Sequence, residues 1–244
     1  MRHSRAIFPS QVIALSISLL LLLACSTSIS IPSPSNPSKL VGCSDLMRPL
    51  PFDVIFKETS VDSLEAQIRN VSDLGAVVIQ VSPQDRMEDV VVDWNGSLGR
   101  YYALFREGRL TKIDMEWYGM KPTIGQVVDC LGPPEFYHAI YRQDHTRNVQ
   151  IALWYIDRGV VFDGYAAYTQ PDLPRISSGF ELGQVSIAMP SRIDELVSDV
   201  YSVSYVPNVY AYALRILKPW PGSIEAIEVD SCIENPDLCK VDGP

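Results

Sequence analysis

One segment of the chain places its apolar residues at the spacing of a helical face. Thr123 and Gln126 form a capping-box pair, and Gly132 followed by two prolines ends the pattern. The positions i, i+3, i+4 and i+7 between them are occupied by Ile124, Val127, Val128 and Leu131. The pattern therefore predicts a helix from Thr123 to Leu131.

Two further segments have one apolar stripe each. One begins near Ser60 or Asp62, and the other begins at Ser191 with Asp194 at the capping-box position. Their stripes are Val61, Leu64, Ile68 and Val71 in the first segment, and Ile193, Leu196, Val197 and Val200 in the second. Both are predicted to be helices that bury a single face.

Between the first two predicted helices the period of the pattern changes to two. Residues 110–117 alternate in the manner of a strand with one buried and one solvated face. The turn dipeptides Asn95-Gly96 and Glu107-Gly108 flank a second strand, Arg100 to Arg106. Residues 88–117 are therefore predicted to form a three-stranded antiparallel meander.

A second meander is predicted after the helix at 123–131, with strands at 135–143, 149–156 and 160–166. After the third helix, residues 210–217 and 223–229 are weaker strand candidates. The apolar stripes begin at Val61, Ile124 and Ile193, 63 and 69 residues apart, which suggests a degenerate repeat of a helix and a meander. The expected fold class is α+β, with short helices packed on one face of antiparallel sheet.

Composition and charge exclude some functions. The chain has 244 residues, of which 47% are apolar, enough for one or two cores. Its formal net charge is −9 and its pI is near 4.8, so it lacks the basic surface that nucleic-acid binding needs.

The N-terminus has the pattern of an export signal. Arg2 and Arg5 precede an apolar run from Val12 to Ala24, too short to span a bilayer. The run ends in Leu-Leu-Ala-Cys, which resembles a bacterial lipobox and makes Cys25 the expected site of lipid attachment. The alternative is an ordinary signal peptide, with Cys25 an incidental thiol.

A polar spacer follows Cys25. Residues 26–41 contain six serines and three prolines and cannot form a core. In a polyproline-like conformation they would hold the folded body up to about 50 Å from the lipid. Cleavage before Cys25 removes two arginines and takes the formal net charge from −9 to −11.

The expected organisation is therefore a signal peptide (1–24), a lipidated cysteine with its tether (25–41), and three units of the body. These units are 42–118, an α+β unit; 119–170, a helix-plus-meander unit; and 171–244, a third, weaker unit with a C-terminal arm.

Four cysteines follow Cys25, and they permit three disulfide pairings. Cys232 and Cys239 are the favoured pair, because they bracket an Asn-Pro turn near the C-terminus. The alternative is that all four are free thiols, with Cys130 a small core residue. A zinc site is not expected, because paired C-x-x-C spacing is absent from the sequence.

Catalytic chemistry has few candidates. His138 shares the strand phase of Phe136 and Ile140, so a partly buried, hydrogen-bonded role is favoured over that of a general base. His145 lies beside Asp144 in a predicted turn without a nucleophile motif. Asp194 and Glu195 suit the first turn of a helix. We assign no catalytic residue, no metal site and no cofactor.

Aromatic residues are concentrated in the two meanders and the C-terminal arm, and most of them are expected in the core. Tyr137 and Tyr141 lie on the strand face opposite Phe136 and Ile140. If they are exposed, they form a stripe of the kind used at protein interfaces or for stacking on sugar rings. They are the candidate interface residues.

Residues 119–134 carry a family resemblance. The segment contains Gly119-Met120-Lys121-Pro122-Thr123, then Val127-Val128, then Leu131-Gly132-Pro133-Pro134. This pattern resembles the helix of the SmpA/OmlA/BamE family of small lipoproteins. The resemblance implies a non-enzymatic envelope lipoprotein that scaffolds outer-membrane protein assembly. The related β-lactamase-inhibitor proteins use a similar helix-plus-meander unit to bind another protein. This chain is about twice as long as these lipoproteins.

The leading hypothesis is a non-enzymatic lipoprotein, attached to the cell membrane on its extracytoplasmic side, whose acidic body binds another envelope protein. The alternatives are a ligand-binding or glycan-binding lipoprotein and, less favoured, a hydrolase. The sequence does not indicate the oligomeric state, nor does it distinguish the inner from the outer membrane.

Overall fold

The computed structural model describes residues 41–239 apart from 48–49, 51–52, 72–79, 84–89, 97, 144–146, 169, 171 and 201–208. All of them belong to one unit, Ser38–Pro244. Cys25 and the predicted tether up to residue 40 lie outside the described residues, as do Asp144 and His145.

The first meander has four strands, one more than predicted. They are β1 (Gln80–Pro83), β2 (Val90–Asn95), β3 (Gly99–Arg106) and β4 (Arg109–Trp117), paired antiparallel in chain order. The predicted meander at 88–117 is confirmed. In β4, Lys112 and Asp114 lie on one face, and Ile113 and Met115 point into the core from the other.

The second meander also has a fourth strand that the sequence did not predict. Its strands are β5 (Phe136–Gln143), β6 (Arg147–Tyr155), β7 (Val160–Ala167) and β8 (Gln184–Ala188). The three predicted strands are confirmed, and β8 lies beyond the expected end of this unit at residue 170. The turn after β6 is a short 3₁₀ helix, η1 (Ile156–Arg158), closed by Gly159 at φ 64. A Cβ there would lie 2.3 Å from the Ala188 carbonyl oxygen, so this turn requires glycine.

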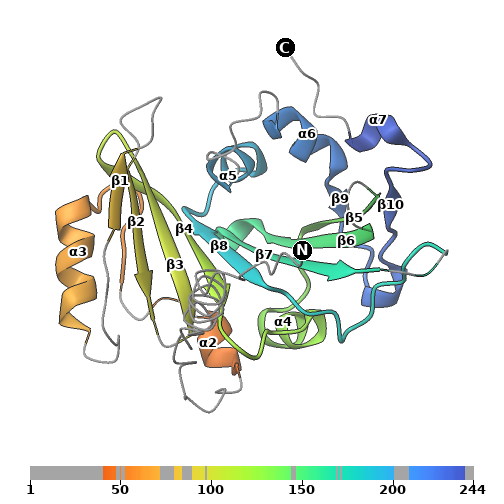
Figure 1. Cartoon of the computed structure of the whole chain (residues 1–244), viewed down its shortest axis with the longest axis horizontal. Helices are drawn as coiled ribbons and strands as arrows, with labels where there is room; N and C mark the ends of the chain where they lie inside the picture. Colours follow the sequence, from red (N-terminus) through yellow and green to blue (C-terminus); the bar gives the residue numbers. More distant parts are fainter. Residues whose placement is uncertain are drawn as a thin grey trace, which may run out of the picture. The chain divides into compact units, whose positions relative to one another are not determined.

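The two meanders join into one mixed sheet through their last strands. The order is β1-β2-β3-β4-β8-β7-β6-β5-β10, with β9 (Lys218–Pro219) also paired to β5. The β10 strand (Asp230–Ser231) runs parallel to β5, whereas the other described pairs are antiparallel. Figure 1 shows the sheet turning sharply between the two meanders. The fold class is α+β, dominated by the sheet.

Three helices lie on one face of this sheet. They are α2 (Cys43–Met47), α3 (Val61–Asn70) and α4 (Ile124–Leu131). Ser60 caps α3, and Thr123 and Gln126 form the predicted capping box of α4. The buried residues of these helices share a cluster with alternate residues of both meanders, such as Trp94 and Leu153.

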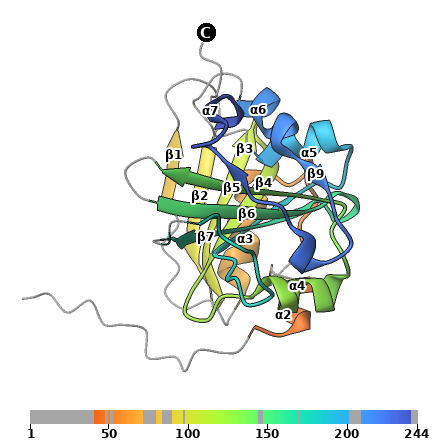
Figure 2. The ribbon, with the colours of Figure 1, turned by 90° about the vertical axis from the view of Figure 1, so that its right-hand side faces the viewer.

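Two more helices lie on the opposite face, over the second meander. Figures 1 and 2 both place α5 (Ile193–Val200) and α6 (Val209–Ile216) on the side of this meander away from α4. Their buried residues pack on Trp154, Val161 and Ile140. The expectation that helices cover only one face is therefore wrong for this half of the sheet.

The predicted strands of the third unit are also wrong. Residues 210–217 lie mostly in α6, because Tyr212, Ala213 and Ile216 are buried at helical spacing. The segment 223–229 contains only a 3₁₀ turn, η2 (Ile224–Ala226). A last helix, α7 (Pro236–Cys239), follows β10. The third unit, 171–244, therefore contributes β8 to the second meander and adds α5, α6, α7 and the two short strands β9 and β10 in place of another meander.

Candidate functional site

The face of the first meander opposite α3 carries an ordered group of polar and aromatic side chains. We call it the Arg100 patch, and its members are Asp93, Asn95, Arg100, Tyr102, Glu116 and Tyr118. They come from β2, β3 and the end of β4, where alternate positions point away from the core. The register brings them together: Arg100 pairs with Glu116 on one side and with Asn95 on the other.

Arg100 is the centre of the patch. Its Nε lies 3.1 Å from Asp93 Oδ1 and its Nη2 lies 2.5 Å from Asp93 Oδ2, so the pair is bidentate. The guanidinium lies over the Tyr102 ring, 4.8 Å from its centroid. The hydrogen bond to Asp93 raises the pKa of Arg100, and the bidentate contact holds the guanidinium in one orientation.

Two tyrosines complete the patch. The Tyr102 hydroxyl donates to Glu116 Oε2 at 3.5 Å, and the Tyr118 hydroxyl donates to Asn95 Oδ1. Partial burial raises the pKa of both hydroxyls, with Glu116 adding to the shift. Tyr118 is 46% exposed, and Glu116 and Arg100 are also exposed. The patch thus offers rings, a cation and carboxylates that are ordered before anything binds.

On the same side of the sheet, α5 and α6 cover the second meander, and the cover begins at Lys112 on β4. Lys112 Nζ lies 2.8 Å from Asp114 Oδ2 and donates to the Val200 carbonyl at 2.7 Å, at the end of α5. Asp114 Oδ1 accepts from Ser186 on β8 at 2.7 Å. Lys112 is 5% exposed, so this is a buried link that fixes α5 to the sheet beside the Arg100 patch.

One aromatic side chain stands out on the second meander. Tyr165 on β7 is 61% exposed, and its hydroxyl accepts from Gln150 Nε2 at 2.9 Å. Burial of the hydroxyl raises the pKa of Tyr165 to about 12, so it remains protonated at ordinary pH. The ring is therefore held at one end with its surface open to solvent.

The interface residues predicted from the sequence lie elsewhere. Tyr137 and Tyr141 do face away from Phe136 and Ile140, but they are only 2% and 4% exposed. The ring of Tyr137 packs edge-on against Trp220, and that of Tyr141 against Tyr168. Their use as an interface is wrong, because the C-terminal arm and the end of the second meander cover them.

His138 is hydrogen-bonded, as predicted, but it is almost fully buried, where partial burial was expected. It is 1% exposed, and the Trp154 indole N–H donates to its Nδ1 at 3.3 Å. Burial, with Arg142 nearby, lowers the pKa of His138 to about 3, so the ring is neutral. A buried, neutral ring already used as an acceptor is not accessible to a substrate.

Asp194 and Glu195 lie in the first turn of α5, as expected from the sequence. Both line an open pocket of about 300 Å³, together with Lys57, Ser198 and Asp199. Asp194 also forms an ion pair with Arg192 at 3.2 Å.

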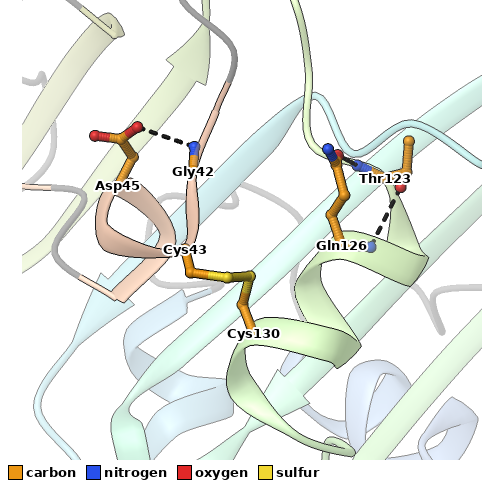
Figure 3. Close-up of a disulfide and its surroundings, with 6 residues drawn as sticks. All are labelled: Gly42, Cys43, Asp45, Thr123, Gln126 and Cys130. Atoms are coloured by element: carbon orange, nitrogen blue, oxygen red, sulfur yellow. Dashed lines mark hydrogen bonds between the residues drawn. A yellow bond between two sulfur atoms is a disulfide. The ribbon is translucent and has the colours of Figure 1, made fainter.

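A disulfide joins Cys43 in α2 to Cys130 in α4 (Figure 3). The alternative of four free thiols is therefore wrong. This bond leaves Cys239 as the remaining partner for Cys232 among the four cysteines. Cys232 is itself disulfide-bonded, and the side chain of Cys239 lies outside the described residues, so the Cys232–Cys239 pairing stays a prediction.

The described residues contain no group of three or more His, Cys, Asp or Glu side chains placed to hold a metal ion. Their helices are all too short or too polar to cross a bilayer. Comparison with protein-family models, curated proteins and solved structures finds no match to this chain.

Sequence reasoning missed the Arg100 patch. The signal that could have found it is alternation within β3: Tyr101, Ala103 and Phe105 are in the core, which places Arg100 and Tyr102 on the other face. An arginine and tyrosines on the solvated face of a meander are residue types enriched at protein interfaces.

Proposed function

We propose that this chain is a lipoprotein, attached to the membrane through Cys25, whose body binds another envelope protein through the Arg100 patch. The observation that carries the protein-binding part is the bidentate, ring-stacked Arg100, which is exposed on the outer face of the first meander. Arginine and tyrosine dominate the binding energy of many protein interfaces, and side chains ordered beforehand lose little entropy on binding.

The fold adds support for a degenerate repeat. The strands of the first meander follow the order β1-β2-β3-β4, and those of the second follow β5-β6-β7-β8 in the reverse direction across the sheet. Each meander is preceded by a capped helix, α3 or α4. We interpret them as two copies of one unit, of which the second carries the resemblance to the SmpA/OmlA/BamE family and the β-lactamase-inhibitor proteins.

The membrane part of the proposal is tested by intact-mass spectrometry of protein purified from its native membrane. We expect the mass of residues 25–244 plus acyl chains, and loss of the acyl mass in Cys25→Ser. An unmodified mature mass would mean a released protein and would overturn the anchor, while leaving the binding surface to be tested separately.

The protein-binding part is tested by photo-crosslinking in native membranes. A benzophenone amino acid at position 102 should trap a partner, and Arg100→Glu in the same protein should abolish the product. Arg69 on α3 is a matched control, because it also forms an exposed ion pair, with Glu65 at 2.6 Å. A product of equal yield from position 69, or none from position 102, would exclude the patch as the binding surface.

A second candidate, glycan binding, is favoured by Tyr165. Its ring is open to solvent, with a buried amide donor at its hydroxyl, a combination suited to stacking on a sugar. Soluble peptidoglycan fragments should then raise the Tm of the wild type and leave that of Tyr165→Ala unchanged. If the fragments leave the wild-type Tm unchanged, this candidate is excluded.

A further inference from the structure

Two charged residues on the covered half of the sheet share a face without pairing with each other. Asp163 on β7 pairs with Ala152 on β6, which pairs with His138 on β5. Arg142 is four residues beyond His138 on the same strand, so it points to the same face as Asp163. Within the described part of the chain, the ion pairs include none between Arg142 and Asp163.

Each of these residues has a buried atom left without a hydrogen bond. Asp163 Oδ1 is an acceptor and Arg142 Nε is a donor, and both are shielded from solvent. Buried polar atoms are nearly always satisfied, because an unsatisfied one is costly. An unsatisfied acceptor and an unsatisfied donor of opposite charge thus lie on one face, and the charge of Arg142 acts on the Asp163 carboxyl group, lowering its pKa against the larger effect of burial.

In this structure Arg142 binds a residue of α6. Its Nη2 donates to the Tyr212 hydroxyl at 2.8 Å, and its guanidinium lies 5.9 Å from the centroid of the Tyr212 ring. Tyr212 belongs to α6 and is 6% exposed, packed with Ile140 and Ile216. The bond is therefore a polar link between α6 and β5 beside a small apolar contact.

Asp163 is held by a neutral partner. Gln150 Nε2 donates to its Oδ2 at 3.2 Å. Burial raises the pKa of Asp163 to about 7, whereas Gln150, the Gly164 amide and Arg142 act in the opposite direction. Both protonation states of this carboxyl group are therefore populated near neutral pH.

The other groups that face Asp163 keep their charge across this range. Tyr165 on β7 stays protonated and His138 on β5 stays neutral, given their shifted pKa values. The arginines on this side are Arg142 and, over the Tyr212 ring, Arg215, and the β8 neighbour of Asp163 is Gln184, which does not titrate. Of these described neighbours, Asp163 alone changes charge between about pH 5 and pH 9.

We propose that Arg142 has two alternative partners, the Tyr212 hydroxyl when Asp163 is protonated and the Asp163 carboxylate when it is ionised, so that the attachment of α6 depends on pH. A carboxylate is a much stronger acceptor for a guanidinium than a neutral hydroxyl, above all in a low-dielectric environment. Ionisation of Asp163 therefore draws Arg142 away from α6 and satisfies both buried atoms.

The first test is a ¹³C NMR titration of the Asp163 carboxyl carbon, assigned with Asp163→Asn. In Tyr212→Phe, Arg142 loses its competing acceptor, so the pKa of Asp163 should fall by about half a unit or more. In Arg142→Met it should rise. Because Tyr212→Phe keeps the ring in its apolar contact, it separates loss of the hydrogen bond from loss of folding. An identical titration in the wild type and Tyr212→Phe would overturn the proposal.

The second test is amide hydrogen exchange of α6, corrected for the intrinsic rate at each pH. In the wild type, the α6 amides should exchange at least about twofold faster at pH 8.5 than at pH 5.5. In Asp163→Asn, which is neutral at both values, this difference should vanish. Equal protection at both pH values in the wild type would exclude a pH-dependent attachment of α6.

Discussion

The two meanders share a strand order and a preceding helix, yet they differ in what covers them. Along β6, every residue from Val149 to Tyr155 is buried, because α4 lies beneath this half and α5 and α6 lie above it. Along the first part of β3, buried residues of the core face alternate with the exposed Arg100 and the partly exposed Tyr102, and only further along is the outward-facing Leu104 buried. The segments after β8 therefore cover the second meander, whereas on the first they bury Lys112 and, among the described residues, leave the side chains around Arg100 open to solvent.

The difference is already present in the residue types of the strands. Ile151-Ala152-Leu153-Trp154 in β6 is continuously apolar, as in a strand packed on both faces, whereas Lys112-Ile113-Asp114-Met115 in β4 alternates. Lys112 is the exception that connects the halves, because it is buried by the end of α5.

The largest loss of stability should come from truncating Trp154, a large buried side chain between the second meander and α5. Trp154 is fully buried between the sheet and α5. Trp154→Ala should lower the free energy of unfolding by about 4 kcal/mol, through lost burial and the cavity left behind. Urea unfolding measures this loss. A change below about 1 kcal/mol would mean that α5 and α6 do not form a packed layer over this meander.

The second-largest effect should come from removing the Cys43–Cys130 disulfide, which joins α2, before the first meander, to α4, before the second. Cys43→Ser with Cys130→Ser opens a loop whose ends are 87 residues apart in sequence. The free energy of unfolding should fall by about 3 kcal/mol, because the denatured chain gains conformational entropy. The double serine variant is preferable to a reductant, which would also reduce the disulfide at Cys232. An unchanged urea midpoint would contradict this expectation.

The link between the two halves should have a smaller effect. Lys112→Met leaves the Asp114 carboxylate without its cation and the end of α5 without a donor, and should lower the free energy of unfolding by about 2 kcal/mol. The double variant Lys112→Met, Asp114→Asn is the control. It should recover part of the loss, because no buried charge remains unpaired, and a further loss would argue against this account.

The smallest effect on stability should appear in the Arg100 patch. Tyr102→Ala removes a ring that lies on the solvated side of β3, so the free energy of unfolding should change by less than about 0.5 kcal/mol. The same substitution should reduce partner capture in the proposed cross-linking experiment, with the photoreactive residue moved to position 118. A stability loss comparable to that of Trp154→Ala would show that this face is also part of the core.

The parts of the fold that the sequence predicted are those specified locally. The helices α3, α4 and α5 have apolar stripes within a single segment, α3 and α4 also have the predicted capping residues, and the meander turns at 95–96, 107–108 and 157–159 contain glycine or asparagine. Such signals act over a few residues and survive in the folded chain.

The parts that it did not predict depend on distant contacts. The apolar run at 210–217 is compatible with a strand or a helix, and only packing on Trp154 and Ile140 selects α6. The Cys43–Cys130 pairing joins segments 87 residues apart, which cysteine spacing alone does not specify. Tyr137 and Tyr141 alternate with apolar residues along β5, as exposed residues of a strand do. They are buried by distant segments, Tyr137 by Trp220 in the C-terminal arm and Tyr141 by Tyr168.

The position of the Cys43–Cys130 disulfide has a mechanical consequence. Cys43 is the first residue of α2, immediately after Val41 and Gly42, where the described chain begins (Figure 3). A pulling force applied to the N-terminal segment therefore reaches a covalent bond to α4 before it reaches α3 or the first meander. The load passes into the helix that packs beneath the second meander, and residues 44–129 are bypassed, so the body resists being unravelled from its N-terminus.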